Sequence, residues 1–215
     1  MSNEVLVVVS GGEAPSRGAV WAVPEGALVV AADRGLEHAR ALGLEVAVAV
    51  GDFDSASPEA VAAAERAGVR IERHVAEKDE TDLELALDAA IDLEPARILV
   101  LAGRGGRLDH ELSSLLLLCS EKYAGVQIDA LVGEAKVHVV RGARELEGVR
   151  GELLTLLPAH GVAEGVRTAG LAYPLQGETL DAGSTRGVSN IFVERTARVA
   201  LERGVLLAIR PGGAE

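Results

Sequence analysis

The stretch Gly51-Asp52-Phe53-Asp54-Ser55 decides how the rest of this chain is interpreted. It follows the apolar run at 46–50 directly, and such a run is typical of a buried strand. Residues i and i+2 of a strand point to the same side, so a turn beyond its end lets both carboxylates reach one cation. Magnesium that bridges a polyphosphate is a natural occupant. The motif alone fits a helix cap or a solvated turn equally well, so its neighbours must decide.

The composition favours a folded protein with a substantial core and an acidic surface. The chain has 215 residues, 48% of them hydrophobic, which is enough for one large or two smaller domains. No basic stretch precedes the short apolar run at 5–9, so we expect a cytoplasmic protein without a membrane partner. Cys119 is the only cysteine and is predicted to be structural. The net charge of -12 opposes nucleic-acid binding, whereas clustered aspartates attract divalent cations.

The first part of the chain alternates short β-branched runs with segments rich in Ala, Leu, Glu and Arg. This alternation is typical of βαβ units around a parallel sheet. We expect strands at 5–9, 27–31, 46–50, 70–74, 97–101 and 127–132, with helices at 17–23, 36–42, 58–67, 82–93 and 108–123.

After Gly133 the pattern changes to short alternating runs that are broken by glycine and proline. It predicts an antiparallel sandwich or barrel, with strands at 136–140, 152–157, 165–168, 190–193, 196–201 and 205–209. The predicted fold class is therefore α/β. A doubly wound, mostly parallel sheet domain at 1–133 is followed by an antiparallel β-sandwich domain at 134–215.

Polar residues and glycines recur after five consecutive predicted strands. Ligands of open α/β sheets bind beyond the carboxyl ends of the strands, so this placement indicates one shared site. Four aspartates with an arginine and two glycine loops favour a magnesium-nucleotide site. In chain order the loops carry Ser10-Gly11-Gly12, then Asp33 and Gly35, then Asp52 and Asp54, then Glu77-Lys78-Asp79-Glu80-Thr81-Asp82, and finally Gly103-Arg104-Gly105-Gly106-Arg107-Leu108-Asp109-His110.

Several of these residues also have purely structural explanations. Gly11 and Gly12 fit a tight turn as well as a close approach to phosphate. Asp82 stands at a predicted helix start, where the helix dipole stabilises a carboxylate without any further role. Lys78 is either a solvated charge or a group that reaches a phosphate oxygen. These alternatives stay open at the level of the single residue.

The segment around Arg107 carries more weight, because a forked guanidinium before a helix suits phosphate. Asp109 could instead cap that helix, and His110 could bond a backbone carbonyl. The chain has neither G-x-x-x-x-G-K-[ST] nor a G-x-G-x-x-G after its first strand. P-loop chemistry is therefore excluded, and a nicotinamide-binding fold is disfavoured.

Taken together, these segments resemble the thiamine pyrophosphokinase family, also called the thiamine diphosphokinase family. The matches follow the family's order over nearly the whole chain. They are Ala32-Asp33-Arg34-Gly35, Gly51-Asp52-Phe53-Asp54-Ser55, Lys78-Asp79-Glu80-Thr81-Asp82, Gly105-Gly106-Arg107-Leu108-Asp109-His110, Gly170-Leu171-Ala172-Tyr173-Pro174-Leu175 and Gly187-Val188-Ser189-Asn190.

The resemblance implies a kinase-like transferase that moves a diphosphate group from Mg-ATP to the hydroxyl of thiamine, giving thiamine diphosphate and AMP. It also implies a homodimer with active sites at the subunit interface. Asp52, Asp54 and Asp82 would hold Mg²⁺ and, with Arg107 and Asp109, form the catalytic set. The implied nucleotide contacts are Gly11, Gly12, Asp33, Lys78, Asp79, Thr81, Gly106, Arg107 and His110.

Thiamine would contact Tyr173, Ser189 and Asn190 in the second domain. Asn190 has an argument of its own, because it is the only interior asparagine in a chain that has almost none. Three other functions stay open: a diphosphokinase for a hydroxymethylpterin, a D-x-D sugar-nucleotide glycosyltransferase and a non-catalytic nucleotide sensor. The proton acceptor is equally open, with Asp79 and Asp109 as candidates.

Overall fold

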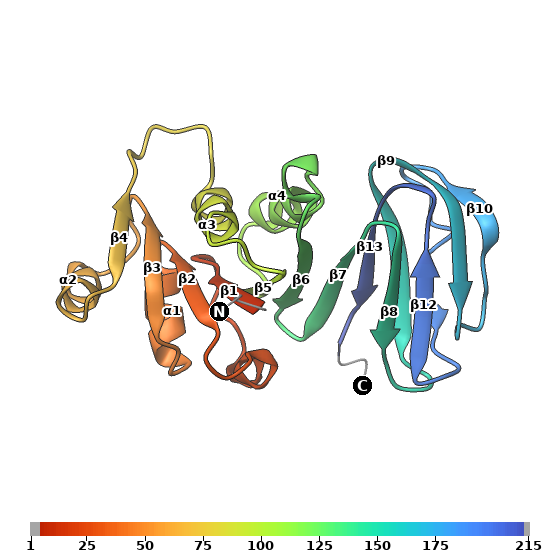
Figure 1. Cartoon of the computed structure of the whole chain (residues 1–215), viewed down its shortest axis with the longest axis horizontal. Coiled ribbons are helices and arrows are strands. Elements are labelled where there is room, and N and C mark those ends of the chain that lie inside the picture. The colour runs from red at the N-terminus through yellow and green to blue at the C-terminus, as the bar shows by residue number, and fades with distance from the viewer. Residues whose placement is uncertain (1–4, 213–215) are drawn as a thin grey trace. The chain divides into compact units, whose positions relative to one another are not determined.

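The computed structural model describes residues 5–212, which form two compact units (Figure 1). The first unit contains the chain up to Ser114 together with Val126–Glu134. The second contains Leu115–Gly125 and the chain from Ala135 onward. The elements of the first unit are β1 (Val5–Val9), η1 (Arg17–Ala22), β2 (Leu28–Ala32), α1 (Gly35–Ala41), β3 (Val46–Gly51), α2 (Pro58–Arg66), β4 (Arg70–Arg73), α3 (Asp82–Ile91), β5 (Arg97–Ala102), the start of α4 (Leu108–Leu118) and β6 (Gln127–Val132).

The first unit is a six-stranded, entirely parallel sheet in the order β4-β3-β2-β1-β5-β6. Successive strands run from β1 outward to β4, and the chain then returns to the other side of β1. Right-handed crossovers therefore place α1 and α3 on opposite faces of the sheet (Figure 1). The point of reversal lies between β1 and β5, and this is where open α/β sheets bind their ligands.

Burial explains why the strands of this unit are so apolar. Strand β1 has the sequence VLVVV, and four of its five residues are buried because both faces of the sheet are covered. On the α1 side, Val7, Val29, Ala39 and Leu99 belong to one hydrophobic cluster. The predicted doubly wound, parallel architecture is confirmed.

The second unit is antiparallel and is built around one long strand. Its elements are η2 (Glu121–Tyr123), β7 (Ala135–Val140), β8 (Ala143–Glu147), β9 (Leu153–Ala169), β10 (Gln176–Leu180), β11 (Asn190–Ile191), β12 (Thr196–Ala200) and β13 (Arg203–Arg210). The first half of β9 pairs mainly with β13, whereas its second half pairs with β12 and β10. His160, at φ 56°, and Gly161, at φ 124°, separate the two halves. One strand thus serves two layers around a shared core, and the predicted antiparallel second half is confirmed.

Residues 115–125 group with the second unit, although the sequence pattern assigned them to the first. The Nη2 atom of Arg141 donates to the carbonyl oxygens of Cys119 and Ser120 at 2.6 and 2.9 Å, which ties this segment to β7 and β8. The predicted helix 108–123 ends at Leu118, and Ser120 caps a separate 3-10 turn. Cys119 is buried, and this burial raises the pKa of its thiol to about 12, in keeping with a structural role.

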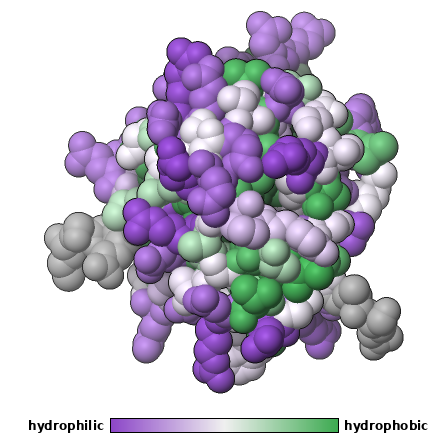
Figure 2. All heavy atoms as spheres, turned by 90° about the vertical axis from the view of Figure 1, so that its right-hand side faces the viewer, coloured by the Kyte–Doolittle hydropathy of each residue, from purple (hydrophilic) through white to green (hydrophobic). Residues whose placement is uncertain are grey.

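One face of the molecule is mostly polar. Figure 2 shows a face on which hydrophilic side chains surround smaller hydrophobic patches. The longest helix within residues 5–212 is α4, whose 11 residues are too few to cross a membrane.

Candidate active site

Loops from five strands meet at the carboxyl edge of the parallel sheet. We call this edge the rim, and it comprises residues 10–16, 33–34, 52–57, 74–81 and 103–107. The backbone N–H of Gly103 donates to the carbonyl oxygen of Glu13 at 2.9 Å, which joins the loops after β1 and β5. A Cβ atom at Gly11 would lie only 2.7 Å from the carbonyl oxygen of Ala32. The glycine therefore lets the β1 loop lie directly on the end of β2.

The acidic motif after β3 is held in place by its central aromatic residue. Phe53 adopts a left-handed conformation (φ 59°) and is buried in a cluster with Leu36 and Val61. The two flanking aspartates then lie at the edge of the sheet. The backbone N–H of Asp54 donates to Oδ1 of Asp52 at 3.1 Å, which tightens the turn. Anchoring Phe53 in the core thus presents Asp52 and Asp54 at the rim.

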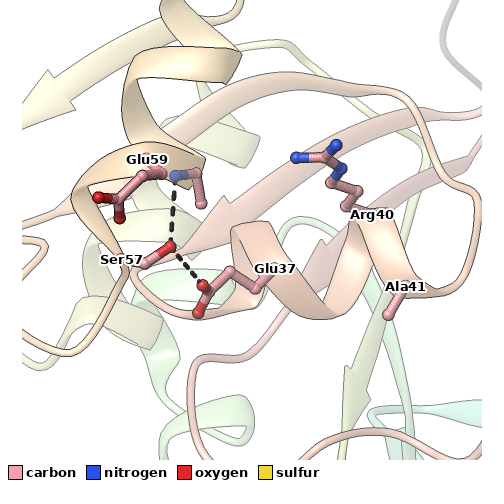
Figure 3. A pocket seen from close by; sticks show the side chains of 6 residues that line it. Glu37, Arg40, Ala41, Ser57 and Glu59 are labelled. Atoms are coloured by element: carbon pink, nitrogen blue, oxygen red, sulfur yellow. Dashed lines mark hydrogen bonds between the residues drawn. The ribbon is translucent and has the colours of Figure 1, made fainter.

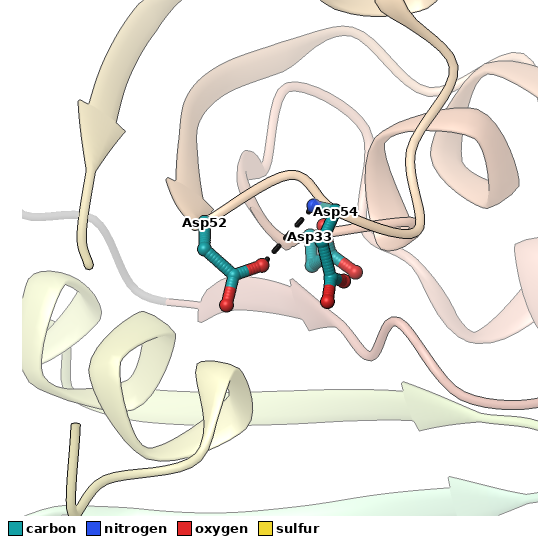
Figure 4. A group of neighbouring side chains, drawn as sticks. All are labelled: Asp33, Asp52 and Asp54. Atoms are coloured by element: carbon teal, nitrogen blue, oxygen red, sulfur yellow. Dashed lines mark hydrogen bonds between the residues drawn. The ribbon is translucent and has the colours of Figure 1, made fainter. Parts of the chain in front are cut away.

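Asp33, which follows β2, completes a group of three carboxylates with Asp52 and Asp54 (Figure 4). One oxygen from each residue lies within 4.8 Å of the other two. Asp33 is only 5% exposed, and its Oδ2 atom accepts a hydrogen bond from Ser55. Its Oδ1 atom is buried and has no hydrogen-bond partner among the described residues. A buried carboxylate oxygen without a partner is costly, and a hard cation would satisfy it.

The family resemblance assigned Asp33 to the nucleotide and Asp82 to the metal. In the structure Asp33 is the residue that joins Asp52 and Asp54, whereas Asp82 lies across a lysine from them. The sequence signals for Asp33 were its position directly after a predicted strand and the match of Ala32-Asp33-Arg34-Gly35 to the family. Spacing along the chain could not reveal its burial.

Lys78 bridges the motif to the start of α3. Its Nζ atom lies 3.0 Å from Oδ2 of Asp52 and 3.1 Å from Oδ1 of Asp82. Burial alone would lower the pKa of the Lys78 ammonium, but its hydrogen bonds to both carboxylates outweigh burial and hold this pKa above its usual range. The same bond to Lys78 lowers the pKa of Asp52. The sequence left open whether Lys78 is solvated, and the structure places it between two carboxylates.

Helix α3 begins where the sequence predicts, because Thr81 caps it. The Oγ1 atom of Thr81 accepts a hydrogen bond from the backbone N–H of Glu84 at 3.2 Å. Asp82 thereby occupies the first helical position, where the helix dipole favours its negative charge. Asp79 is exposed on the preceding loop.

Ser57 connects the end of the acidic loop to α1. Its hydroxyl accepts from the backbone N–H of Ala60 at 3.3 Å and donates to Oε1 of Glu37 at 2.7 Å (Figure 3). These contacts start α2 and fix the loop against α1. An open depression of about 500 Å³ lies beside this contact, lined by Glu37, Arg40, Ala41, Ser57, Glu59 and Ala60.

Arg107 and Asp109 pair with each other on the loop after β5. The Nε and Nη2 atoms of Arg107 lie 3.2 and 2.5 Å from the two carboxylate oxygens of Asp109, and this pairing lowers the pKa of Asp109 to about 2. Both side chains are exposed, as is His110. Within residues 5–212, no hydrogen bond or ion pair joins Arg107 or Asp109 to the three clustered aspartates. The guanidinium is accessible from solvent but already has an anionic partner.

In the second unit the predicted thiamine contacts gather around β11. The side chain of Asn190 is buried and bonds the backbone of Tyr173 twice. Its Oδ1 accepts from the N–H at 3.0 Å, and its Nδ2 donates to the carbonyl at 2.7 Å. Tyr173 itself is 65% exposed. Ser189 is also exposed, and its backbone N–H donates to Thr155. Asn190 therefore holds the loop that carries Tyr173, while Tyr173 and Ser189 face outward.

The fold and the rim define the class: this is a two-unit α/β protein, in which a parallel sheet with an acidic rim is followed by an antiparallel β unit. Two family models match it: "Thiamin pyrophosphokinase, catalytic domain" over residues 22–129 and "Thiamin pyrophosphokinase, vitamin B1 binding domain" over residues 137–206. The chain therefore belongs to the thiamin pyrophosphokinase family, whose members are kinase-type transferases.

Individual relatives agree with this assignment. The thiamine pyrophosphokinase of Bacillus subtilis (strain 168) is 28% identical over 188 residues, which cover 86% of this chain and 88% of the relative. The crystal structure of the B. subtilis thiamine pyrophosphokinase superposes with a TM-score of 0.84 at 24% identity, covering 97% of this chain and 99% of that one. The Geobacillus thermodenitrificans structure gives 0.82 at 26% identity, with 98% and 99% covered.

Proposed function

We propose that the protein transfers a diphosphate group from ATP to the hydroxyl of thiamine, producing thiamine diphosphate and AMP. The observation that carries this proposal is the cluster of three carboxylates from Asp33, Asp52 and Asp54. It lies on a chain that matches both domains of the family. In this transfer the thiamine oxygen forms a bond to the β-phosphorus, and the bond from that phosphorus to the AMP oxygen breaks.

The residues present fit a magnesium ion, because they offer only oxygen ligands and one of these is buried without a partner. Asp33, Asp52 and Asp54 would hold it. Bound there, the ion would neutralise negative charge on the transferring phosphates. The remaining work of the protein is positioning, which suits phosphoryl transfer because its transition state needs little covalent assistance.

Arg107 would contribute the principal organic cation. Its forked guanidinium matches a pair of phosphate oxygens, and the phosphates would replace Asp109 as its partner. Asp109, once released, has a free carboxylate. Asp79, exposed on the α3 loop, is a second group able to accept the thiamine hydroxyl proton. The two variants Asp79→Asn and Asp109→Asn distinguish these acceptors by their effect on kcat.

Release of AMP upon addition of thiamine and Mg-ATP tests the proposal. We expect Asp54→Asn to lower kcat by about a hundredfold or more, since one ligand of the charge-neutralising ion is lost. The melting temperature should stay close to that of the wild type, because the Asp54 side chain is exposed and does not pack in the hydrophobic core. Glu59→Gln, an acidic residue on α2 outside the cluster, serves as the matched control.

Three results would count against this function. Near-normal turnover of Asp54→Asn contradicts the metal assignment. Turnover with a hydroxymethylpterin in place of thiamine would identify a different acceptor. Binding of Mg-ATP without AMP release when thiamine is added would indicate a nucleotide sensor.

We also propose that the protein acts as a homodimer. The support is an apolar stripe on α4, where Leu108 and Leu112 are 77% and 56% exposed one helical turn apart. Exposed leucines at this spacing are typical of a helix that packs against a partner. Sedimentation equilibrium should give twice the monomer mass of 22.3 kDa, and Leu112→Asp should shift the protein toward the monomer.

A further inference from the structure

Lys78 occupies an unusual position on the rim. It lies on the loop between β4 and α3, and every neighbour from Arg73 to Thr81 is exposed. The Lys78 side chain is only 10% exposed because its ammonium is drawn inward between Asp52 and Asp82. The middle of the loop is thus held at the site by a charged side chain, while its first residue, His74, donates its backbone N–H to the carbonyl oxygen of Gly51 at 3.0 Å.

The Lys78 ammonium lies between two carboxylates, at a position that a metal cation bridging them could also occupy. Without Lys78 the negative charges of Asp52 and Asp82 would repel each other at partly buried positions, where charge interactions are stronger than in water. A divalent ion that binds Asp52 must therefore displace the ammonium from the same oxygens or accept a positive charge close by. Either outcome weakens the binding of the bare ion.

A nucleotide changes this balance, because its phosphates coordinate the cation and also offer an anionic partner to the displaced lysine. We propose that Lys78 is an internal counter-ion that makes cation binding depend on the nucleotide. It holds Asp52 and Asp82 in the metal-free protein and releases them only when phosphate arrives. On this view Lys78 exchanges its two carboxylate partners for a phosphate, and the inference rests on the proposed magnesium-nucleotide site. Linkage then requires that metal and nucleotide strengthen each other's binding.

The test measures binding of Mn²⁺, a paramagnetic substitute for Mg²⁺, by electron paramagnetic resonance of the free ion. Titrations are done with and without a non-hydrolysable ATP analogue. Lys78→Met should bind Mn²⁺ alone about tenfold more tightly than the wild type, and the analogue should improve its affinity by a smaller factor. Lys78→Arg keeps the charge and should behave more like the wild type. Arg66→Met, which removes a cation on α2 that bonds only its own helix, is the matched control.

A second readout is independent of the titration. Addition of Mg²⁺ without nucleotide should raise the melting temperature of Lys78→Met more than that of the wild type, because the freed carboxylates gain a partner. If Lys78→Met folds poorly, Lys78→Gln provides the same loss of charge with a polar side chain.

The outcomes separate this inference from the proposed function. Equal Mn²⁺ affinity of Lys78→Met and wild type, with normal binding of the Mn-analogue complex by both, overturns the counter-ion role alone. The role is also overturned if Arg66→Met binds Mn²⁺ as much more tightly than the wild type as Lys78→Met does. Loss of any positive charge would then explain the tighter binding. Failure of the wild type to bind Mn²⁺ even with the analogue contradicts the metal-nucleotide site itself.

Discussion

At the scale of single residues, Asn190 shows how a polar side chain can serve a site from within the core. Its amide satisfies both backbone groups of Tyr173, and Oδ1 also accepts from the N–H of Ile191 at 2.9 Å. These bonds use Oδ1 twice and one N–H of Nδ2, so under the proposed function Asn190 would serve thiamine binding chiefly by positioning its neighbours. Tyr173 and Ser189 are exposed beside it, as the proposed thiamine contact requires.

Asn190→Ala should therefore destabilise the protein. The substitution leaves two backbone groups of Tyr173 without partners, and a buried unsatisfied group costs about 1–3 kcal/mol. Urea denaturation should show a midpoint clearly below that of the wild type. Gln127→Ala, which removes an exposed amide, should change the unfolding free energy by less than about 0.5 kcal/mol. If the two variants were equally stable, the amide would not hold the loop.

The sequence could identify Asn190 as important but not say how it acts. Its rarity singled it out, whereas its burial depends on the pairing of β11 with β9. Lys78 is a similar case. Its acidic surroundings were visible from the sequence, but the bridge to Asp52 joins residues 26 positions apart.

At the scale of elements, close packing between α1 and β1 fixes where the β2 loop lies. A Cβ atom at Gly35 would lie 2.1 Å from the carbonyl oxygen of Val9, so the first turn of α1 touches the backbone of β1. Gly35→Ala should force these elements apart and lower the unfolding free energy by roughly 1–3 kcal/mol or more. Gly12→Ala is the control for stability, because nothing lies within 4 Å of its added Cβ. Thermal melts of both variants decide the matter, and equal melting temperatures would contradict the close approach.

The strands of the first unit were predictable because they are mostly short apolar runs; β4, with the sequence RIER, is the exception. The six strands and the starts of α2 and α3 lie within a residue or so of their predicted positions. The second unit was harder. Strands β8 and β10, with sequences ARELE and QGETL, bury one residue each and so lack an apolar pattern. The predicted strands 152–157 and 165–168 are one strand, β9, because its glycines produce irregular pairing and do not end it.

At the scale of the whole molecule, the rim was predictable from topology alone. Polar residues after parallel strands must collect at one edge of the sheet, whatever their distance along the chain. Which of them meet is decided by strand order. β2 and β3 are neighbours, so Asp33 meets Asp52 and Asp54. The loop after β4 reaches Asp52 through the long side chain of Lys78. No sequence pattern could specify this contact.

Acid should destabilise the protein, although its net charge of -12 alone suggests the opposite. Protonation relieves general repulsion, but it also removes specific partners. Burial would raise the pKa of Glu152, yet its two 2.7 Å bonds to Arg210 and one to the N–H of Val149 outweigh burial and hold this pKa below its usual range. A carboxylate whose pKa is lower in the folded state binds fewer protons there than in the unfolded state. Its stabilisation is therefore complete above about pH 5 and is lost as the pH falls through the folded pKa.

Asp52 shifts in the same direction through its bond to Lys78, so both units carry such a group. Urea midpoints measured from pH 7 to pH 3 should fall steeply below about pH 4.5. Glu152→Gln should be less stable than the wild type at pH 7 and should lose less stability on acidification, because the neutral amide cannot be titrated. Parallel curves for the two proteins would show that Glu152 does not contribute to the slope. A wild-type midpoint that rose at low pH would mean that relief of the net charge outweighs the loss of these ion pairs.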